Sequence, residues 1–110
     1  MFRVIKIENF DILYFEGTIL DIDEKFEMQK LFDKHKNLLK CLDISCVEKV
    51  SFDFWRFVQK ENISLLAPKP WVLLDFSFNN LSFSAKLFLN FENFIENKNR
   101  LVCRKLERLS

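Results

Sequence analysis

Glycine and proline are scarce in this chain of 110 residues, which has one Gly and two Pro. So little of either argues against a flexible linker, a low-complexity chain or a repeat protein. The single Gly also excludes the glycine-rich loops that hold phosphate groups in the common nucleotide-binding proteins. The length fits one domain, residues 1–110, with one hydrophobic core.

Long apolar runs and an excess of either charge are also absent. No stretch approaches the roughly 20 apolar residues that span a bilayer, and Arg3, Lys6 and Glu8 interrupt the N-terminus before a signal peptide could form. The 17 Lys and Arg against 16 Asp and Glu give a net charge of +1, which supplies no field that draws nucleic acid or an acidic membrane. We therefore expect a soluble, cytoplasmic protein with no nucleic-acid partner and no direct membrane insertion.

Metal ligands and catalytic groups are few. Cys41, Cys46 and Cys103 are an odd number of cysteines in a chain without a signal peptide, which favours reduced thiols. The spacing of the first two does not match the short cysteine pairs of zinc sites, and His35 is the one histidine. No Ser or Cys stands in a recognisable nucleophile elbow. We expect no metal site, no cofactor and no enzymatic activity.

Phenylalanine, in contrast, is abundant, with 14 copies. One small core can hardly accommodate so many rings, so some of them should lie on the surface or in an interface. This surplus favours a protein that binds a partner.

The spacing of apolar residues predicts alternating strands and helices along the chain. The predicted strands are Arg3–Ile7 and Ile12–Phe15, which form an antiparallel hairpin, then Leu39–Ile44, Ile63–Ala67 and Phe83–Leu89. The predicted helices are Asp23–Leu39, Phe52–Glu61, a short one from Trp71 toward Asn79, and a long C-terminal one capped by Asn90. The segment VLLDFSF in the third helix also alternates as a strand would. The order β-β-α-β-α-β-α-β-α predicts an α/β fold, an open mixed sheet of four to five strands with helices packed on it.

This order of elements, with the turn and cap residues between them, resembles the STAS domain, which is shared by sulfate transporters and bacterial anti-sigma factor antagonists. Three pieces carry the resemblance: FEGTILD at Phe15–Asp21, the strand LDIS with Val47 two residues beyond it, and the tail LFLNFENFIE. In the first piece, Asp21 stands three residues before Glu24 in the spacing of a capping box. The resemblance runs over nearly the whole chain and implies a single STAS-like domain.

In the STAS family, the strand that resembles LDIS leads to Asp-Ser-Ser/Thr-Gly-Leu at the start of the second helix. A partner kinase phosphorylates the second hydroxyl residue of that motif. Aligning on LDIS places Ser51 at the family Asp, Phe52 at the first Ser, Asp53 at the phosphorylated residue, Phe54 at the Gly and Trp55 at the Leu. A permanent carboxylate then replaces the switch hydroxyl, so phosphorylation at that position is impossible, and Ser51 remains as a displaced candidate.

The physics of a helix start accounts for part of this segment. Ser51 as cap and Asp53 in the first turn each stabilise a helix by about 0.3–2 kcal/mol. Capping does not explain Phe52 and Trp55, which we expect to leave the apolar stripe of the helix and to face outward. Aromatic side chains around a charged helix start are typical of an interaction hot spot. We therefore predict a partner-binding or regulatory site whose residues are Ser51, Phe52, Asp53 and Trp55.

The resemblance implies a non-enzymatic protein–protein interaction module, an anti-sigma factor antagonist-like regulator in bacterial signalling. Its partner would be an anti-sigma kinase-like regulator. The alternative that the resemblance allows is the small cytoplasmic STAS subunit of an ABC-type lipid transporter, with a transporter subunit as partner. The aromatic surplus leaves a third alternative open, a homo-oligomeric protein such as a homodimer, or a small-ligand-binding α/β protein.

Overall fold

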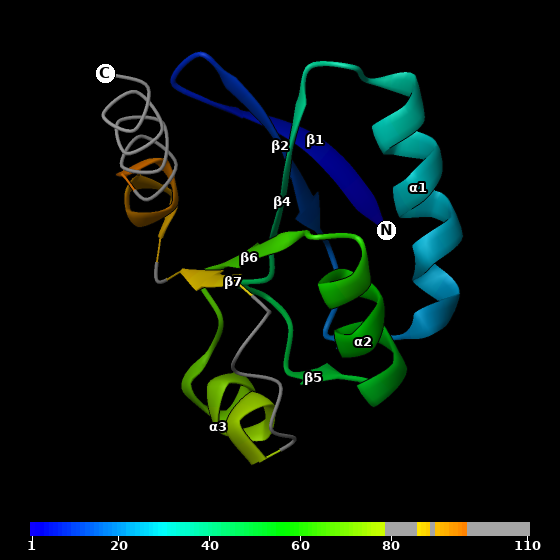
Figure 1. Ribbon diagram of the computed structural model, residues 1–110, viewed down its shortest axis with the longest axis vertical. Helices are drawn as coiled ribbons and strands as arrows, with labels where there is room; N and C mark the ends of the chain where they lie inside the picture. The colour runs from blue at the N-terminus through cyan, green and yellow to red at the C-terminus, as the bar shows by residue number, and fades with distance from the viewer. Residues whose placement is uncertain (79–85, 89, 97–110) are drawn as a thin grey trace, which may run out of the picture.

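The computed structural model describes residues 1–78, 86–88 and 90–96, of which the side chains at 76–78 and 86 are excepted (Figure 1). The elements in chain order are β1 (Phe2–Ile7), β2 (Phe10–Phe15), β3 (Ile19–Leu20), the 3-10 helix η1 (Ile22–Glu24), α1 (Lys25–Lys34), β4 (Leu38–Asp43), β5 (Lys49–Val50), α2 (Phe52–Lys60), β6 (Ser64–Leu66), α3 (Pro70–Phe78) and β7 (Lys86–Phe88). Residues 91–96 are also helical.

The main sheet has five strands in the order β1-β2-β4-β6-β7. β1 runs antiparallel to β2, and the other neighbours are parallel. Leu13, Leu42, Leu65 and Leu87 are in register across the four parallel strands. The predicted hairpin is confirmed, and its turn contains Glu8 with a φ of 57°. The predicted mixed α/β fold is therefore confirmed.

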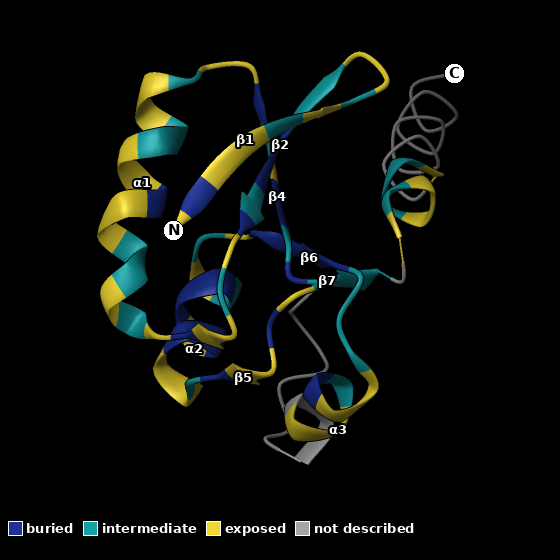
Figure 2. Cartoon of the chain, turned by 180° about the vertical axis from the view of Figure 1, so that it is seen from behind, coloured by how far each residue is buried: buried dark blue, intermediate teal, exposed yellow. Residues whose placement is uncertain are grey.

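The two faces of the main sheet each carry an apolar cluster. Helices α1 and α2 cover one face, and residues 91–96, orange in Figure 1, lie on the other. The larger cluster includes Met28 of α1 and Phe54 of α2. The smaller cluster is centred on Ile12, with Phe91 and Phe94 packed against it. The single core expected from the length is thus divided by the sheet, because the central strands are apolar on both faces (Figure 2).

The first helix is shorter than the predicted span Asp23–Leu39. A 3-10 turn leads into α1, which ends at Lys34, and His35 has extended backbone with φ −107° and ψ 91°. The chain then enters β4, whose first residue, Leu38, pairs with Asp11 of β2. The prediction was wrong at this end because an apolar pair such as Leu-Leu fits a helical period and a strand period equally well.

The later elements agree with the predictions to within a few residues. Strands β4 and β6 and helix α2 lie where they were expected, and VLLDFSF is helical, so its strand alternative is wrong. β7 confirms the middle of the predicted strand Phe83–Leu89. The cap at Asn90 is confirmed, since its Oδ1 accepts a hydrogen bond of 2.9 Å from the N–H of Asn93. The ends of that strand, the helix beyond residue 96 and Cys103 lie outside the described residues. Within the described ranges, no helix is both long and apolar enough to cross a membrane.

Candidate interaction site at the start of helix α2

Helix α2 begins at a serine cap. Ser51 has extended backbone, with φ −70° and ψ 151°. Its Oγ accepts a hydrogen bond of 3.2 Å from the N–H of Phe54, and its carbonyl oxygen accepts one of 3.1 Å from the N–H of Trp55. The first bond satisfies an amide that the helix itself leaves without an acceptor, and the second starts the helical ladder. The predicted capping role of Ser51 is confirmed.

A small parallel ladder holds this cap in place. β3 pairs with β5, and the N–H of Ser51 donates a hydrogen bond of 2.9 Å to the carbonyl oxygen of Leu20. The N–H groups of Glu48 and Lys49 both donate to the carbonyl oxygen of Thr18, at 2.7 and 3.0 Å. The sequence predicted a loop around Glu48 and Lys49. The prediction was wrong at Lys49, which belongs to β5. Two-residue strands are too short to show a period, so no pattern in the sequence indicates them.

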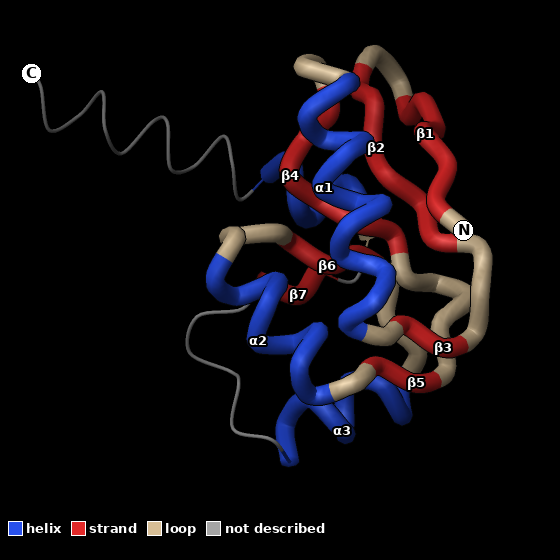
Figure 3. Tube along the Cα trace, turned by 90° about the vertical axis from the view of Figure 1, so that its right-hand side faces the viewer, coloured by secondary structure: helices blue, strands red, loops and turns tan. Residues whose placement is uncertain are grey.

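The same ladder leads into the first helical segment. Asp21 follows β3, and its Oδ1 accepts a hydrogen bond of 2.6 Å from the N–H of Ile22. The carbonyl oxygen of Asp21 accepts a further bond of 3.1 Å from the N–H of Glu24. The predicted cap at Asp21 is confirmed, but its side chain bonds the N–H of Ile22 rather than that of Glu24, the bond that a capping box would make. Because β3 and β5 lie side by side, the two helical segments start next to each other (Figure 3). The positive ends of their peptide dipoles therefore lie at the same end of the molecule.

Phe52 and Asp53 form the first turn of α2 and face solvent. The side chain of Phe52 is 48% exposed, and Asp53 is also exposed. The guanidinium carbon of Arg56 lies 5.9 Å from the centroid of the Phe52 ring, within the range of a cation–π contact. The carboxylate of Asp53 lies where the helix dipole favours a negative charge. The structure thus places a ring and a carboxylate together on the surface beside the cap.

Trp55 does not lie in this surface. It is fully buried, at 0% exposure, and belongs to the larger cluster with Phe54, Phe57 and Val58. At about 100° per residue, these four side chains cover an arc of about 160° of the helix. The prediction that Trp55 faces outward was wrong because α2 buries a wider stripe than the Phe54, Phe57 and Val58 positions define.

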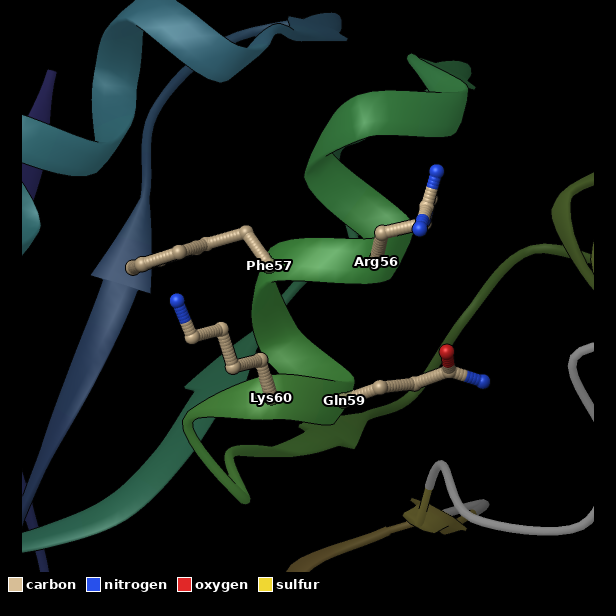
Figure 4. Close-up of a pocket in the computed structure, with 4 residues that line it drawn as sticks. All are labelled: Arg56, Phe57, Gln59 and Lys60. Atoms are coloured by element: carbon tan, nitrogen blue, oxygen red, sulfur yellow. The ribbon is translucent and has the colours of Figure 1, made fainter.

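The exposed side of α2 continues from the first turn into a shallow basic hollow. Its volume is about 520 Å³, and it is lined by Arg56, Phe57, Gln59 and Lys60. Arg56 and Gln59 project from one side of the helix, whereas Phe57 and Lys60 project from the other (Figure 4). The side chains do not converge on a common point, which is the arrangement of a contact surface rather than of a small-molecule pocket. The spacing of Phe52, Arg56 and Lys60 at four-residue intervals is the signal that would have added the basic residues to the prediction.

A second polar cluster lies at the carboxyl ends of β2 and β4. The hydroxyl of Tyr14 and the Sγ of exposed Cys46 are 2.7 Å apart, and the N–H of Ser45 donates a hydrogen bond of 2.9 Å to Oδ1 of Asp43. The hydrogen bond with Cys46 raises the pKa of Tyr14 above its ordinary value. His35 lies at the opposite end of β4 from Cys46. The histidine is therefore not placed to act as a base toward this thiol, and in the part of the chain that is described no three side chains are grouped as ligands for a metal ion.

Comparison with known proteins identifies the fold. No protein-family model matches the sequence, and no curated protein matches it. A solved structure of a candidate anti-sigma factor antagonist from Thermotoga maritima is similar, with a TM-score of 0.57 and 16% sequence identity over 87% of this chain and 92% of that chain. At this level of identity the likeness concerns the fold. The chain has a STAS-like fold, as the sequence resemblance implied.

Proposed function

We propose that this STAS-like chain is a non-enzymatic interaction module, an anti-sigma factor antagonist-like regulator of the bacterial cytoplasm that docks on a protein partner through the start of α2. The contact residues are Phe52 and Asp53, with Ser51 beneath them as the cap. Trp55, which the sequence analysis included, supports this surface from inside and does not touch the partner. The observation that carries the proposal is that an exposed ring, Phe52, and an exposed carboxylate, Asp53, occupy consecutive positions in the first turn of a fixed helix start.

A fixed helix start favours binding because little has to be ordered when the partner arrives. The chain between β4 and α2 is held to the segment Thr18–Leu20 by three backbone hydrogen bonds, from Glu48, Lys49 and Ser51. Preorganisation of this kind lowers the entropic cost of association. An aromatic ring beside a charge in such a position has the composition of a binding hot spot.

The charge of this surface is permanent. Asp53 stands where the resemblance places the phosphorylated hydroxyl, and its carboxylate carries about one negative charge where a phosphate carries close to two. Ser51 is half-buried, and its hydroxyl oxygen already accepts the hydrogen bond from Phe54. We infer that Asp53 does not act as a phosphorylation switch, because a carboxylate cannot take the place of the hydroxyl that a kinase modifies.

Basic residues farther along α2 add positive charge to this surface. The exposed stripe runs from Asp53 at the start of α2 to Arg56 and Lys60 farther along. A complementary partner surface would carry a cation opposite Asp53 and separate acidic groups opposite Arg56 and Lys60. The order of the two charges along the helix would fix the orientation of the partner.

Capture of partners from the source cells tests this proposal. The tagged wild-type chain is compared with Phe52→Ala, Asp53→Lys and the double variant, and the captured proteins are identified by mass spectrometry. The matched control is Phe26→Ala, because Phe26 is an exposed ring on α1, at 61% exposure, outside the proposed surface. Circular dichroism confirms that each variant is folded.

The proposal expects the double variant to lose a protein that the wild type and the control both retain. An anti-sigma kinase-like regulator among the lost proteins would support the signalling role, and an ABC transporter subunit would support the transporter-associated alternative. Equal recovery of every captured protein by the double variant and the wild type would remove the start of α2 as the docking surface.

A further inference from the structure

Helix α3 is apolar on almost every side. Its sequence is PWVLLDFSF, in which Asp75 is the one charged residue. A helix that faces water on one side normally carries polar residues there, and a helix that is apolar all round is normally covered on all sides. The sequence of α3 therefore predicts a helix with a neighbour on each face.

The described residues of the chain cover α3 on one side. Among its described side chains, residues 70–75, only Val72 is buried, and it belongs to the larger apolar cluster. Trp71 is 52% exposed and Leu74 is 60% exposed. These two side chains are three residues apart and so lie next to each other on one face of the helix. Figure 2 shows exposed positions, in yellow, on the described part of α3, which lies at one end of the molecule.

Charges of opposite sign flank this apolar face. Lys69 precedes α3, and its Nζ lies 5.5 Å from the centroid of the Trp71 ring, so the ammonium group lies at the N-terminal edge of the face. Asp75 is exposed and lies four residues after Trp71, at the other edge. The Nζ of Lys69 also lies 3.9 Å from Oε1 of Glu48. The neighbourhood is therefore close to neutral and would not be drawn to an anionic lipid surface.

We propose that the α3 face, defined as Lys69, Trp71, Leu74 and Asp75, is a homodimer contact in which α3 packs antiparallel against α3 of a second copy of this chain. A two-fold axis near the midpoint of Trp71 and Leu74 sets each of these side chains against the other one in the second copy. The same axis places Lys69 opposite Asp75 of the second copy at both ends. The apolar centre and the two ion pairs are then matched by one symmetry operation, and this charge complementarity favours a second copy over another occupant.

The inference concerns a different surface from the start of α2 and does not depend on the proposed function. Sedimentation velocity of the full chain, over about two orders of magnitude in concentration, measures the dimer directly. We expect a monomer–dimer equilibrium that Leu74→Glu and Trp71→Ala each weaken by roughly tenfold or more. Phe26→Glu is the matched control, because it places the same charge on another exposed apolar side chain, and it should leave the equilibrium unchanged.

A charge reversal tests the antiparallel arrangement. Asp75→Lys should weaken the dimer, because it places two cations opposite each other at both ends, and Lys69→Asp in the same chain should restore it. A monomer at every concentration would overturn the proposal, as would a dimer that Leu74→Glu leaves intact. Binding of the monomer to phosphatidylglycerol vesicles, lost in Leu74→Glu, would overturn it in favour of a lipid-facing helix.

Discussion

The backbone N–H of Ser51 donates a hydrogen bond of 2.9 Å to the carbonyl oxygen of Leu20. This bond joins the residue that caps α2 to the strand that leads into the first helical segment. The two positions are 31 residues apart in the chain, yet they set the start of both helical segments at one end of the molecule. A docking surface built there rests on backbone hydrogen bonds rather than on a free loop, which is the basis of its preorganisation.

The cap at Ser51 should contribute measurably to stability. Ser51→Ala removes the acceptor of the Phe54 N–H and should lower the free energy of unfolding by about 1 kcal/mol. Ser51→Asn keeps an acceptor and should recover most of this loss. Urea unfolding followed by circular dichroism measures both. A Ser51→Ala variant as stable as the wild type would mean that the cap has no role in holding the helix start.

Truncation of two aromatic residues of α2 should change the stability of the chain by very different amounts. Trp55→Ala empties a fully buried site and should cost about 3–5 kcal/mol of stability. Phe52→Ala removes an exposed ring and should change the free energy of unfolding by no more than about 0.5 kcal/mol. The same urea titration separates them. A large loss of stability in Phe52→Ala would show that its ring has a structural role and would disqualify it as a binding residue.

Much of the fold follows from local patterns in the sequence. The caps at Asp21, Ser51 and Asn90 are local devices, in which a side-chain oxygen bonds an amide one to three residues away, so short motifs reveal them. The five strands of the main sheet also have apolar runs that indicate them. The caps could be predicted because their hydrogen bonds are local, and the strands because each carries its own apolar pattern, although the parallel pairings between strands join distant segments.

The remaining features depend on contacts between distant segments. The β3–β5 pairing joins two segments of two residues each, and the Tyr14–Cys46 contact joins residues that are 32 apart. The burial of Trp55 depends on how the sheet and its neighbours surround α2, which the helical period does not reveal. The start of α2 at Ser51 was therefore predicted correctly, but Trp55, a core residue, was counted as a surface residue.

The phenol of Tyr14 should titrate at higher pH than an ordinary tyrosine. The hydrogen bond with Cys46 raises its pKa above the usual value of 10.0. Tyr14 is the one tyrosine of the chain, so the absorbance of tyrosinate near 295 nm reports it alone. Cys46→Ala should move the midpoint back toward the usual value. An identical midpoint in the variant would show that the two side chains are not in contact in solution.

The raised pKa of Tyr14 determines how the stabilisation from the Tyr14–Cys46 contact depends on pH. Because the folded-state pKa is raised, the contribution of the contact is complete below the pKa of an unfolded tyrosine, about 10. It is lost as the pH rises through the folded-state value. The difference in free energy of unfolding between wild type and Cys46→Ala should therefore be constant near neutral pH and shrink in strongly alkaline solution.

Gly17 should not tolerate a methyl group. Its φ is not positive, so replacement by Ala would ordinarily stabilise the chain by about 0.4–1 kcal/mol through the unfolded state. A Cβ at this position would lie 2.8 Å from Cε1 of Phe15, a buried ring that packs against Phe2 with centroids 5.0 Å apart. We expect Gly17→Ala to cost about 1–3 kcal/mol, because the ring cannot move without disturbing the core.

Thr18→Ala is the control for that substitution, since Thr18 is exposed and its side chain should contribute less than about 0.5 kcal/mol. Chemical denaturation of both variants shows whether each substitution raises or lowers the free energy of unfolding. Stabilisation of the chain by Gly17→Ala would contradict the close approach of Phe15 to this glycine.

The central claim, that the start of α2 is the docking surface, is tested most directly by site-specific photo-crosslinking in the source cells. A benzophenone amino acid is placed at position 52 in one chain and at position 26 in another, since both native residues are exposed rings. We predict that irradiation joins a discrete protein to the chain through position 52 and not through position 26, and that Asp53→Lys abolishes this product. A partner that crosslinks through position 26 and not through position 52 would contradict the account.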